Sequence, residues 1–349
     1  MTFQGPTPAG HAGGTGSDAT PRVEAFAPPR WLRNPHLQSV LASSRVRLRR
    51  GQQRLAATGA QTRELLLDGG DGVRLQAWHS ALPGRAPRAL ALLLHGWEGS
   101  AESSYMRLTA AQLLDAGVDV VRLNFRDHGN THHLNRGIFH SCRIDEVVHA
   151  SADLSRRFPH LPLLAAGYSL GGNFVLRLAL RAPAAGVSLR QVASVCPVLD
   201  PALTMDRLEQ GPAIYDWYFH RKWTASLRRK RALFPELAQF DEQVLGLGLR
   251  ELTAWMVQRH TEFASLQDYF DGYSIAGNRL AGLEVPASVL MAQDDPVIPF
   301  HTFEGWQLPA QAQLEVARWG GHCGFIENAR GDGFAERWVA HRLLAALAH

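Results

Sequence analysis

The chain has 349 residues, of which 46% are hydrophobic and 19% charged, and its formal net charge is +4 at pH 7. This composition is that of a soluble globular protein with material for a large core, arranged as one α/β domain with an insertion or as two domains. The charge is too small to indicate a nucleic-acid binder, which concentrates many more cations on one face.

Cysteine content and apolar runs bear on the compartment. The three cysteines, Cys142, Cys196 and Cys323, are few, and their odd number does not allow all of them to pair in a disulfide framework. We therefore expect reduced thiols in a cytoplasmic protein. The N-terminal stretch lacks the apolar core of a secretory signal, and the longest apolar run, "ALALLLHGW", is far shorter than a membrane span. These features predict a soluble, intracellular protein.

The N-terminal part divides into a tail and a segment that packs on the domain. Residues 1–25 are rich in glycine, proline, threonine and alanine without periodicity, which predicts a disordered tail. In residues 26–62, Trp31 and Leu32 are expected to contact the domain, and Asn34 with Pro35 predicts the start of a helix. In "RVRLRR", cations alternate with apolar residues, so a solvated strand or edge is predicted there.

From residue 63 onward, strand patterns alternate with helix patterns. Strands are predicted at 63–68, 73–80, 88–95, 118–125, 161–167, 191–196, 286–295 and 312–319, the first two forming a hairpin around "GGDG". Helices are predicted at 104–117, 143–158, 171–182 and 333–348. Buried strands alternating with helices predict an α/β fold with a mostly parallel sheet covered on both faces. Its core comprises 63–199 and 283–349.

The alternation stops between 200 and 282, where the sequence is helical, aromatic and basic. We interpret this stretch as a helical cap inserted after the sixth strand. Packing of the insert is the expected role of most of its aromatic residues, with one or two also lining an acyl tunnel: Tyr215, Trp217, Tyr218, Phe219 and Trp223. The run "RRKR" (228–231) predicts a solvated helix face, with weak contact to an anionic membrane surface or an acidic substrate as the alternative.

A nucleophile motif follows the fifth predicted strand. In "GYSLGG", Ser169 lies between glycines at the junction of a strand and a helix. A turn this tight requires small flanking residues, projects the hydroxyl above the sheet edge, and places the positive end of the next helix beside it. The flanking elements favour a nucleophilic serine over an incidental serine in a glycine-rich turn.

A serine nucleophile needs a base and an orienting carboxylate, in the chain order serine, acid, histidine for this architecture. "MAQDDPVIP" and "RWGGHCGF" each follow a predicted strand and supply Asp295 and His322. Asp295 is favoured as the acid because it stands four residues before Pro299. Asp294 is interpreted as a turn residue, and Asp200 is a more distant candidate.

The stretch "LLLHGWEGS" predicts the remaining part of such a site. After a strand that ends in His-Gly, the backbone N–H of Trp97 is expected to point into the pocket beside the N–H of Leu170. Two such donors form an oxyanion hole. His95 is expected to brace this loop rather than to titrate in catalysis.

Other motifs do not predict a cofactor or metal. The histidines His128, His132, His133 and His140 lie close together in the chain, but the stretch reads as an irregular loop without the cysteine or carboxylate spacing of a zinc site. Neither a P-loop nor a glycine fingerprint for nucleotides is present. The site is therefore expected to work without cofactors.

Over about residues 60–349 the assembled motifs resemble the α/β-hydrolase family, and more narrowly its YheT-like branch, which includes animal α/β-hydrolase-domain lipases. The narrower resemblance is carried by "RWLRNPHLQS", "HGWEGS", "NFRDHG", "GYSLGGN", "AQDDPVIP" and "GGHCGF". Where the branch often has Arg-Gly, this chain has Arg126-Asp127.

The resemblance implies Ser169 as nucleophile, Asp295 as acid and His322 as base. It also implies hydrolysis of carboxylic esters, with short-chain esters and monoacylglycerols as typical substrates. Two alternatives share the motif: another acyl-transfer enzyme (an acyltransferase, thioesterase or amidase), and a non-catalytic domain that binds a ligand.

Overall fold

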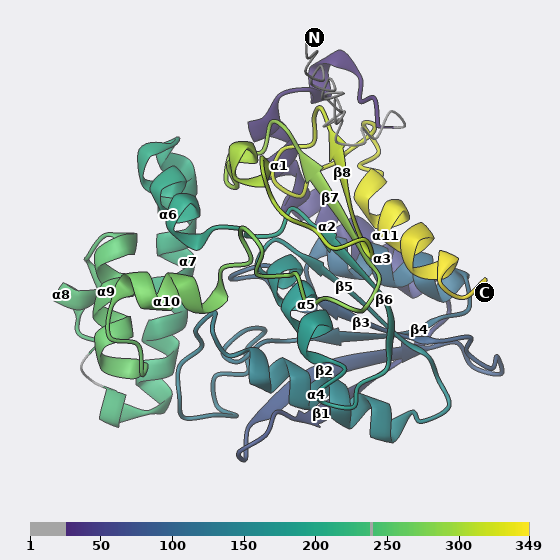
Figure 1. The fold of residues 1–349 in the computed structure, drawn as a ribbon, viewed down its shortest axis with the longest axis horizontal. Coiled ribbons are helices and arrows are strands. Elements are labelled where there is room, and N and C mark those ends of the chain that lie inside the picture. The colour runs from purple at the N-terminus through teal and green to yellow at the C-terminus, as the bar shows by residue number, and fades with distance from the viewer. Residues whose placement is uncertain (1–25, 238–239, 349) are drawn as a thin grey trace, which may run out of the picture.

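The computed structural model describes residues 26–237 and 240–348, so the tail predicted at 1–25 lies outside the described residues. An eight-stranded sheet forms the centre of the molecule, in the order β1-β2-β4-β3-β5-β6-β7-β8 (Figure 1). Its strands are β1 (Gln61–Asp68), β2 (Arg74–Ala81), β3 (Leu90–Leu94), β4 (Asp119–Leu123), β5 (Leu163–Tyr168), β6 (Leu189–Val195), β7 (Ala287–Ala292) and β8 (Ala312–Ala317).

The sheet is parallel except around β2, which pairs antiparallel with both β1 and β4. All residues of β3, β4, β5 and β7 are buried, as expected for strands covered on both faces. The prediction of a mostly parallel α/β sheet is therefore confirmed.

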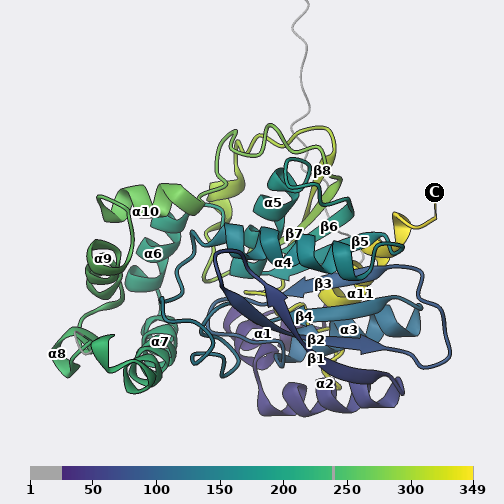
Figure 2. The same cartoon turned by 90° about the horizontal axis from the view of Figure 1, so that it is seen from below.

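Helices cover both faces of this sheet. Helices α3 (Ser104–Asp115) and α11 (Phe334–Ala345) pack on one face, and α4 (Ile144–Arg157) and α5 (Leu170–Arg181) on the other (Figure 2). In the described residues, no helix is both long enough and apolar enough to cross a membrane.

The N-terminal segment contains three helical elements: η1 (Arg30–Leu32), α1 (Pro35–Ala42) and α2 (Arg45–Ala57). Asn34 caps α1 as predicted, since its side chain accepts hydrogen bonds from two backbone N–H groups at 2.9 and 3.0 Å. Leu32 is buried, but Trp31 is 55% exposed, so the packing role predicted for Trp31 is wrong.

The strand predicted from "RVRLRR" is also wrong, because this stretch is the start of α2. Ser44 caps the helix by accepting from the N–H of Arg47 at 3.3 Å. The Arg47 side chain is 2% exposed and pairs with Glu336 of α11, while Val46 is 77% exposed. The four arginines of this run lie on different faces of α2, and Arg47 is the one that points inward.

Five helices separate β6 from β7: α6 (Pro201–Gln210), α7 (Ala213–Leu233), α8 (Glu242–Leu245), α9 (Leu249–His260) and α10 (Leu266–Tyr273), with η2 (Pro235–Leu237) after α7. We call them the cap helices. Figure 1 shows them together on the left, to one side of the sheet. The remaining short element is η3 (Phe300–Phe303), between β7 and β8.

Candidate active site

Ser169 occupies a sharp turn between β5 and α5. Its φ is 54° and its ψ is −119°, a strained conformation that aims the side chain out of the turn. A Cβ on Gly167 would lie 2.0 Å from the carbonyl oxygen of Gly171, and one on Gly171 would lie 2.3 Å from that of Leu94. Both positions therefore require glycine, which is the physical reason for the Gly-x-Ser-x-Gly pattern.

The structure brings Ser169, His322 and Asp295 into one hydrogen-bonded chain. His322 Nε2 lies 2.8 Å from Ser169 Oγ, and His322 Nδ1 lies 2.9 Å from Asp295 Oδ2. A carboxylate only accepts, so in the neutral form of His322 Nδ1 carries the proton and Nε2 is left to accept from the serine hydroxyl. The other oxygen of Asp295 accepts from the N–H groups of Val297 and Ile298, at 2.8 and 2.9 Å, which fixes the carboxylate.

The other two carboxylates considered from the sequence lie elsewhere. Asp294 Oδ1 accepts from the N–H of Gly321 at 2.9 Å, and burial raises the pKa of Asp294 to about 6. Asp200 caps α6 by accepting from the N–H of Leu203 at 3.0 Å. Asp294 thus holds the loop that carries His322, and Asp200 caps the first cap helix. Asp295 is the carboxylate that contacts His322.

The two backbone N–H groups expected to form an oxyanion hole belong to Trp97, just after β3, and Leu170, at the start of α5. Gly96 is so close to Ser169 that a Cβ there would lie 3.3 Å from the serine Cβ. In residues 26–237 and 240–348, the N–H groups of Trp97 and Leu170 have no protein acceptor. The hydroxyl of Tyr105 accepts from the N–H of Gly96 at 3.0 Å and supports the loop. Both expected donors are therefore available to an oxyanion.

His95 braces this loop and does so as a neutral side chain. Its Nδ1 lies 2.7 Å from the carbonyl oxygen of Gly96, and its Nε2 accepts from the N–H of Phe125 at 3.2 Å. One nitrogen must donate and the other accept, which fixes the neutral tautomer. Burial lowers the pKa of His95 well below its ordinary value. A bracing rather than titrating role agrees with this geometry.

Two residues of the N-terminal helix α1 support the loop that carries His322, and neither was predicted from the sequence. Ser39 Oγ accepts from the backbone N–H of His322 at 2.8 Å. The amide of Gln38 donates to the carbonyl oxygen of Ile326 at 3.0 Å and accepts from the N–H of Ile326 at 2.7 Å. Both residues belong to the stretch "RNPHLQS". This stretch is part of the resemblance to the YheT-like branch, which was the one sequence feature that could have pointed to them.

The four clustered histidines do not gather as metal ligands. His128 and His132 bond to protein groups, at Arg126 and Ser226 respectively. Within the described ranges, one group has the closeness of a metal site: Cys196, His322 and Cys323, with ligand atoms within 4.8 Å of one another. Both ring nitrogens of His322 already contact Ser169 and Asp295, so this group offers no free imidazole to a metal.

Two cavities meet at Ser169. An open cleft of about 640 Å³ has Glu98, Lys222 and His322 in its wall. A smaller cavity of about 90 Å³ is mainly apolar, and among its lining residues are Leu170, Met205, Leu208, Trp223, Met256 and Phe270. Trp97, Ser169 and Phe219 line both. Of the cap aromatics, Trp217 is 56% exposed and lines neither.

Comparison with known proteins identifies the family. Residues 91–337 match the alpha/beta hydrolase family. The chain is 30% identical to the esterase-named protein YheT of Escherichia coli, over 86% of this chain and 87% of that protein. It is 23% identical to phospholipase ABHD3 of Mus musculus, over 69% of this chain and 59% of that protein.

Solved structures share the fold at low identity. An esterase of Pyrococcus furiosus has a TM-score of 0.53 and 15% identity, covering 84% of this chain and 92% of that chain. A bacterial membrane phospholipase A has a TM-score of 0.55 and 16% identity, covering 86% of this chain and 91% of that chain. On the family match and the identity to YheT, the chain belongs to the alpha/beta hydrolase family, in the branch of YheT and the related animal ABHD proteins.

Proposed function

We propose that the protein is a serine hydrolase that cleaves carboxylic esters through a covalent acyl-enzyme. The observation that carries the proposal is the chain Ser169–His322–Asp295, with contacts of 2.8 and 2.9 Å, at the point where an open cleft and an apolar cavity meet. Membership of the family and the esterase-named relatives support ester hydrolysis in general.

The proposed reaction has two halves. Ser169 Oγ attacks the ester carbonyl carbon while His322 Nε2 takes the hydroxyl proton, and the N–H groups of Trp97 and Leu170 stabilise the oxyanion. His322 then gives that proton to the departing alcohol, which leaves the acyl group on Ser169. Water attacks the acyl-enzyme by the same route, and the acid is released with the serine hydroxyl restored.

The cavities suggest how an ester lies in the site. The apolar cavity of about 90 Å³ suits the acyl group, because burying each methylene contributes about 0.8 kcal/mol. It is smaller than the roughly 150 Å³ cavity that holds benzene, which favours short acyl chains. The open cleft of about 640 Å³, with charged and hydroxyl side chains in its wall, suits the alcohol portion.

We expect the specificity constant to rise with acyl length to an optimum at short chains and then to fall. Phe270, 3% exposed on α10, lines the apolar cavity, so Phe270→Ala should move the optimum to longer chains. The measurement is kcat/KM across p-nitrophenyl esters of increasing acyl length. Trp217→Ala, an aromatic deletion at the exposed face of α7, is the matched control and should keep the wild-type optimum. If Phe270→Ala does not change the acyl length at which kcat/KM is highest, the acyl group binds in the open cleft instead.

The pH profile should report the state of His322. Burial disfavours its charged form, but the Asp295 carboxylate outweighs burial and raises the pKa of His322 to about 9. The general base must be neutral, so kcat/KM should increase with pH and level off only above that pKa. Asp295→Asn removes the charge that favours the imidazolium and should move this ascending limb to lower pH. A wild-type limb at the ordinary histidine value would show that the carboxylate does not act on His322 in this way.

A further inference from the structure

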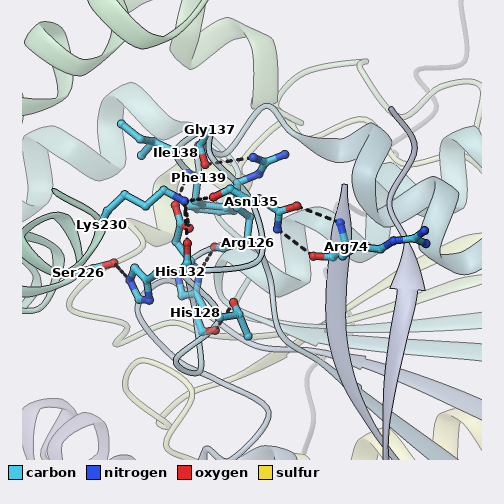
Figure 3. Close-up of polar contacts among 12 residues, drawn as sticks. Arg74, Arg126, His128, His132, Asn135, Gly137, Ile138, Phe139, Ser226 and Lys230 are labelled. Carbon is cyan, nitrogen blue, oxygen red and sulfur yellow. Dashed lines mark hydrogen bonds and ion pairs between the residues drawn. The ribbon is translucent and has the colours of Figure 1, made fainter. Parts of the chain in front are cut away.

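One face of the cap helix α7 contacts two loops of the core. Residues three or four positions apart on a helix lie on the same side, and this spacing defines the contact face: Phe219, Lys222, Trp223, Ser226, Arg229 and Lys230. One of the two core loops is the oxyanion loop, residues 95–99. The other, which we call the 126–139 loop, follows β4 and is drawn with Lys230 in Figure 3.

Lys230 is the buried end of this face. It belongs to the "RRKR" run, and its side chain is 1% exposed, so the prediction of a wholly solvated helix face is wrong at this residue. Its ammonium group lies 2.8 Å from Asp127 Oδ1 and also donates to the carbonyl oxygens of His132, at 3.1 Å, and Asn135 (Figure 3). An ammonium has three donors, and all three are satisfied by the 126–139 loop.

Asp127 adopts an unusual backbone conformation to make this contact. Its φ is 62°, in the left-handed region that favours glycine, and its carboxyl group is buried. Oδ1 accepts from Lys230, and Oδ2 accepts from the N–H of Phe139 at 3.0 Å. The carboxylate therefore closes the 126–139 loop around the lysine of the cap helix.

The next residue connects this loop to the oxyanion loop. His128 Nδ1 lies 2.7 Å from the carbonyl oxygen of Arg126, and His128 Nε2 accepts from the N–H of Glu98 at 3.2 Å. Glu98 also has a left-handed φ, of 55°, and it follows Trp97, whose N–H is a donor of the proposed oxyanion hole. The backbone beside that donor is thus held by a residue adjacent to Asp127.

The other end of the α7 face packs on the oxyanion loop directly. The ring of Phe219 stacks on that of Trp97 with a centroid distance of 5.1 Å and an angle of 10°, and the Trp223 ring contacts the same indole edge-on at 5.6 Å. Lys222 Nζ donates to the carbonyl oxygen of Glu98 at 3.1 Å. Helix α7 therefore contacts both Trp97 and Glu98, in the segment that presents the Trp97 N–H.

We propose that Lys230 and Asp127 are positioning residues that dock α7 against the core and thereby hold the oxyanion donor of Trp97 in place. The proposal rests on the proposed function, since it concerns the oxyanion hole of that reaction. The contacts of α7 with Trp97 and Glu98, together with the Lys230–Asp127 pair, hold the left-handed backbone at Glu98 and with it the adjacent N–H of Trp97.

The test separates positioning from stability by removing the charges singly and together. Lys230→Met leaves a buried carboxylate without its partner, so its melting temperature should fall clearly. The double variant Lys230→Met/Asp127→Asn leaves neither charge unpaired, and asparagine tolerates the left-handed backbone, so its melting temperature should return toward the wild-type value. Each protein is assayed with p-nitrophenyl butyrate, per active site counted by the final extent of fluorophosphonate labelling.

If Lys230 and Asp127 position the oxyanion donor, kcat should stay low in the double variant although its melting temperature recovers. Methionine cannot hold the carbonyl oxygens of His132 and Asn135, so kcat should fall roughly 10- to 100-fold, up to the loss seen when an oxyanion donor is removed, with KM little changed. Arg228→Met, on the same helix, is the control and should retain wild-type kcat, because Arg228 pairs with Glu242 at the surface.

A wild-type kcat in a stable double variant would overturn the positioning role of Lys230 and Asp127. It would not affect the proposed hydrolase function. If Lys230→Met does not fold, Asp127→Asn and the double variant carry the comparison. A wild-type protein that hydrolyses none of the esters would contradict the proposed function, and this inference with it.

Discussion

Replacing Ser169 with alanine should reduce kcat for p-nitrophenyl butyrate by about a millionfold, which is the loss that follows removal of a serine nucleophile whose partners act with it as a unit. In the structure the hydroxyl that is lost is the one within 2.8 Å of His322 Nε2. Some acceleration over water should survive, because the N–H donors of Trp97 and Leu170 remain. The measurement is steady-state hydrolysis by protein of verified folding.

Ser43→Ala is the matched control, since Ser43 lies in the wall of the same cleft without contacting His322. It should retain nearly wild-type turnover. Turnover by Ser169→Ala within about tenfold of the wild type would show that another residue is the nucleophile, because such a loss is far below that of removing one.

Asp295→Asn should reduce kcat by about 10,000-fold, whereas Asp294→Asn should have a much smaller effect. The amide of an asparagine at position 295 can donate to His322 Nδ1, which favours the tautomer whose proton sits on Nε2 and blocks acceptance from Ser169. At position 294 the amide oxygen can still accept from the N–H of Gly321, the contact that Asp294 makes at 2.9 Å.

The comparison is made on the two single variants under identical conditions, with melting temperatures measured alongside. Both carboxyl groups are partly or wholly buried, so a similar change in melting temperature is expected for each. If Asp294→Asn were the more damaging to kcat, the carboxylate that orients the histidine would be Asp294.

The local sequence pattern was enough to predict the sheet. It failed where one side chain of a charged run is buried while its neighbours are exposed. The inner strands were readable because buried parallel strands are continuous apolar runs, such as Leu90–Leu94, separated by helices of ordinary length. "RVRLRR" was misread because alternating cations suit a solvated strand as well as a helix. Which of its arginines turns inward depends on Glu336, nearly three hundred residues away in the chain.

The candidate site was predictable to the extent that its residues sit in recurring turns. The positions of Ser169, Asp295 and His322 follow from their places after β5, β7 and β8, and the structure brings them into contact. The supports of these residues were not predictable in the same way. Ser39 bonds to the backbone of His322 across 283 positions of sequence, and Lys230 meets Asp127 across 103, so neither contact leaves a local pattern.

The most direct test of the proposed mechanism is to trap the acyl-enzyme and find the residue that carries it. The wild-type protein is mixed with p-nitrophenyl butyrate, quenched in acid within the first turnover, digested, and analysed by mass spectrometry, with Ser169→Ala treated in parallel. We expect a butyryl group on the peptide that contains Ser169 in the wild-type protein and none in the variant. A butyryl group on any other residue during turnover, or on the same peptide in Ser169→Ala, would contradict the account.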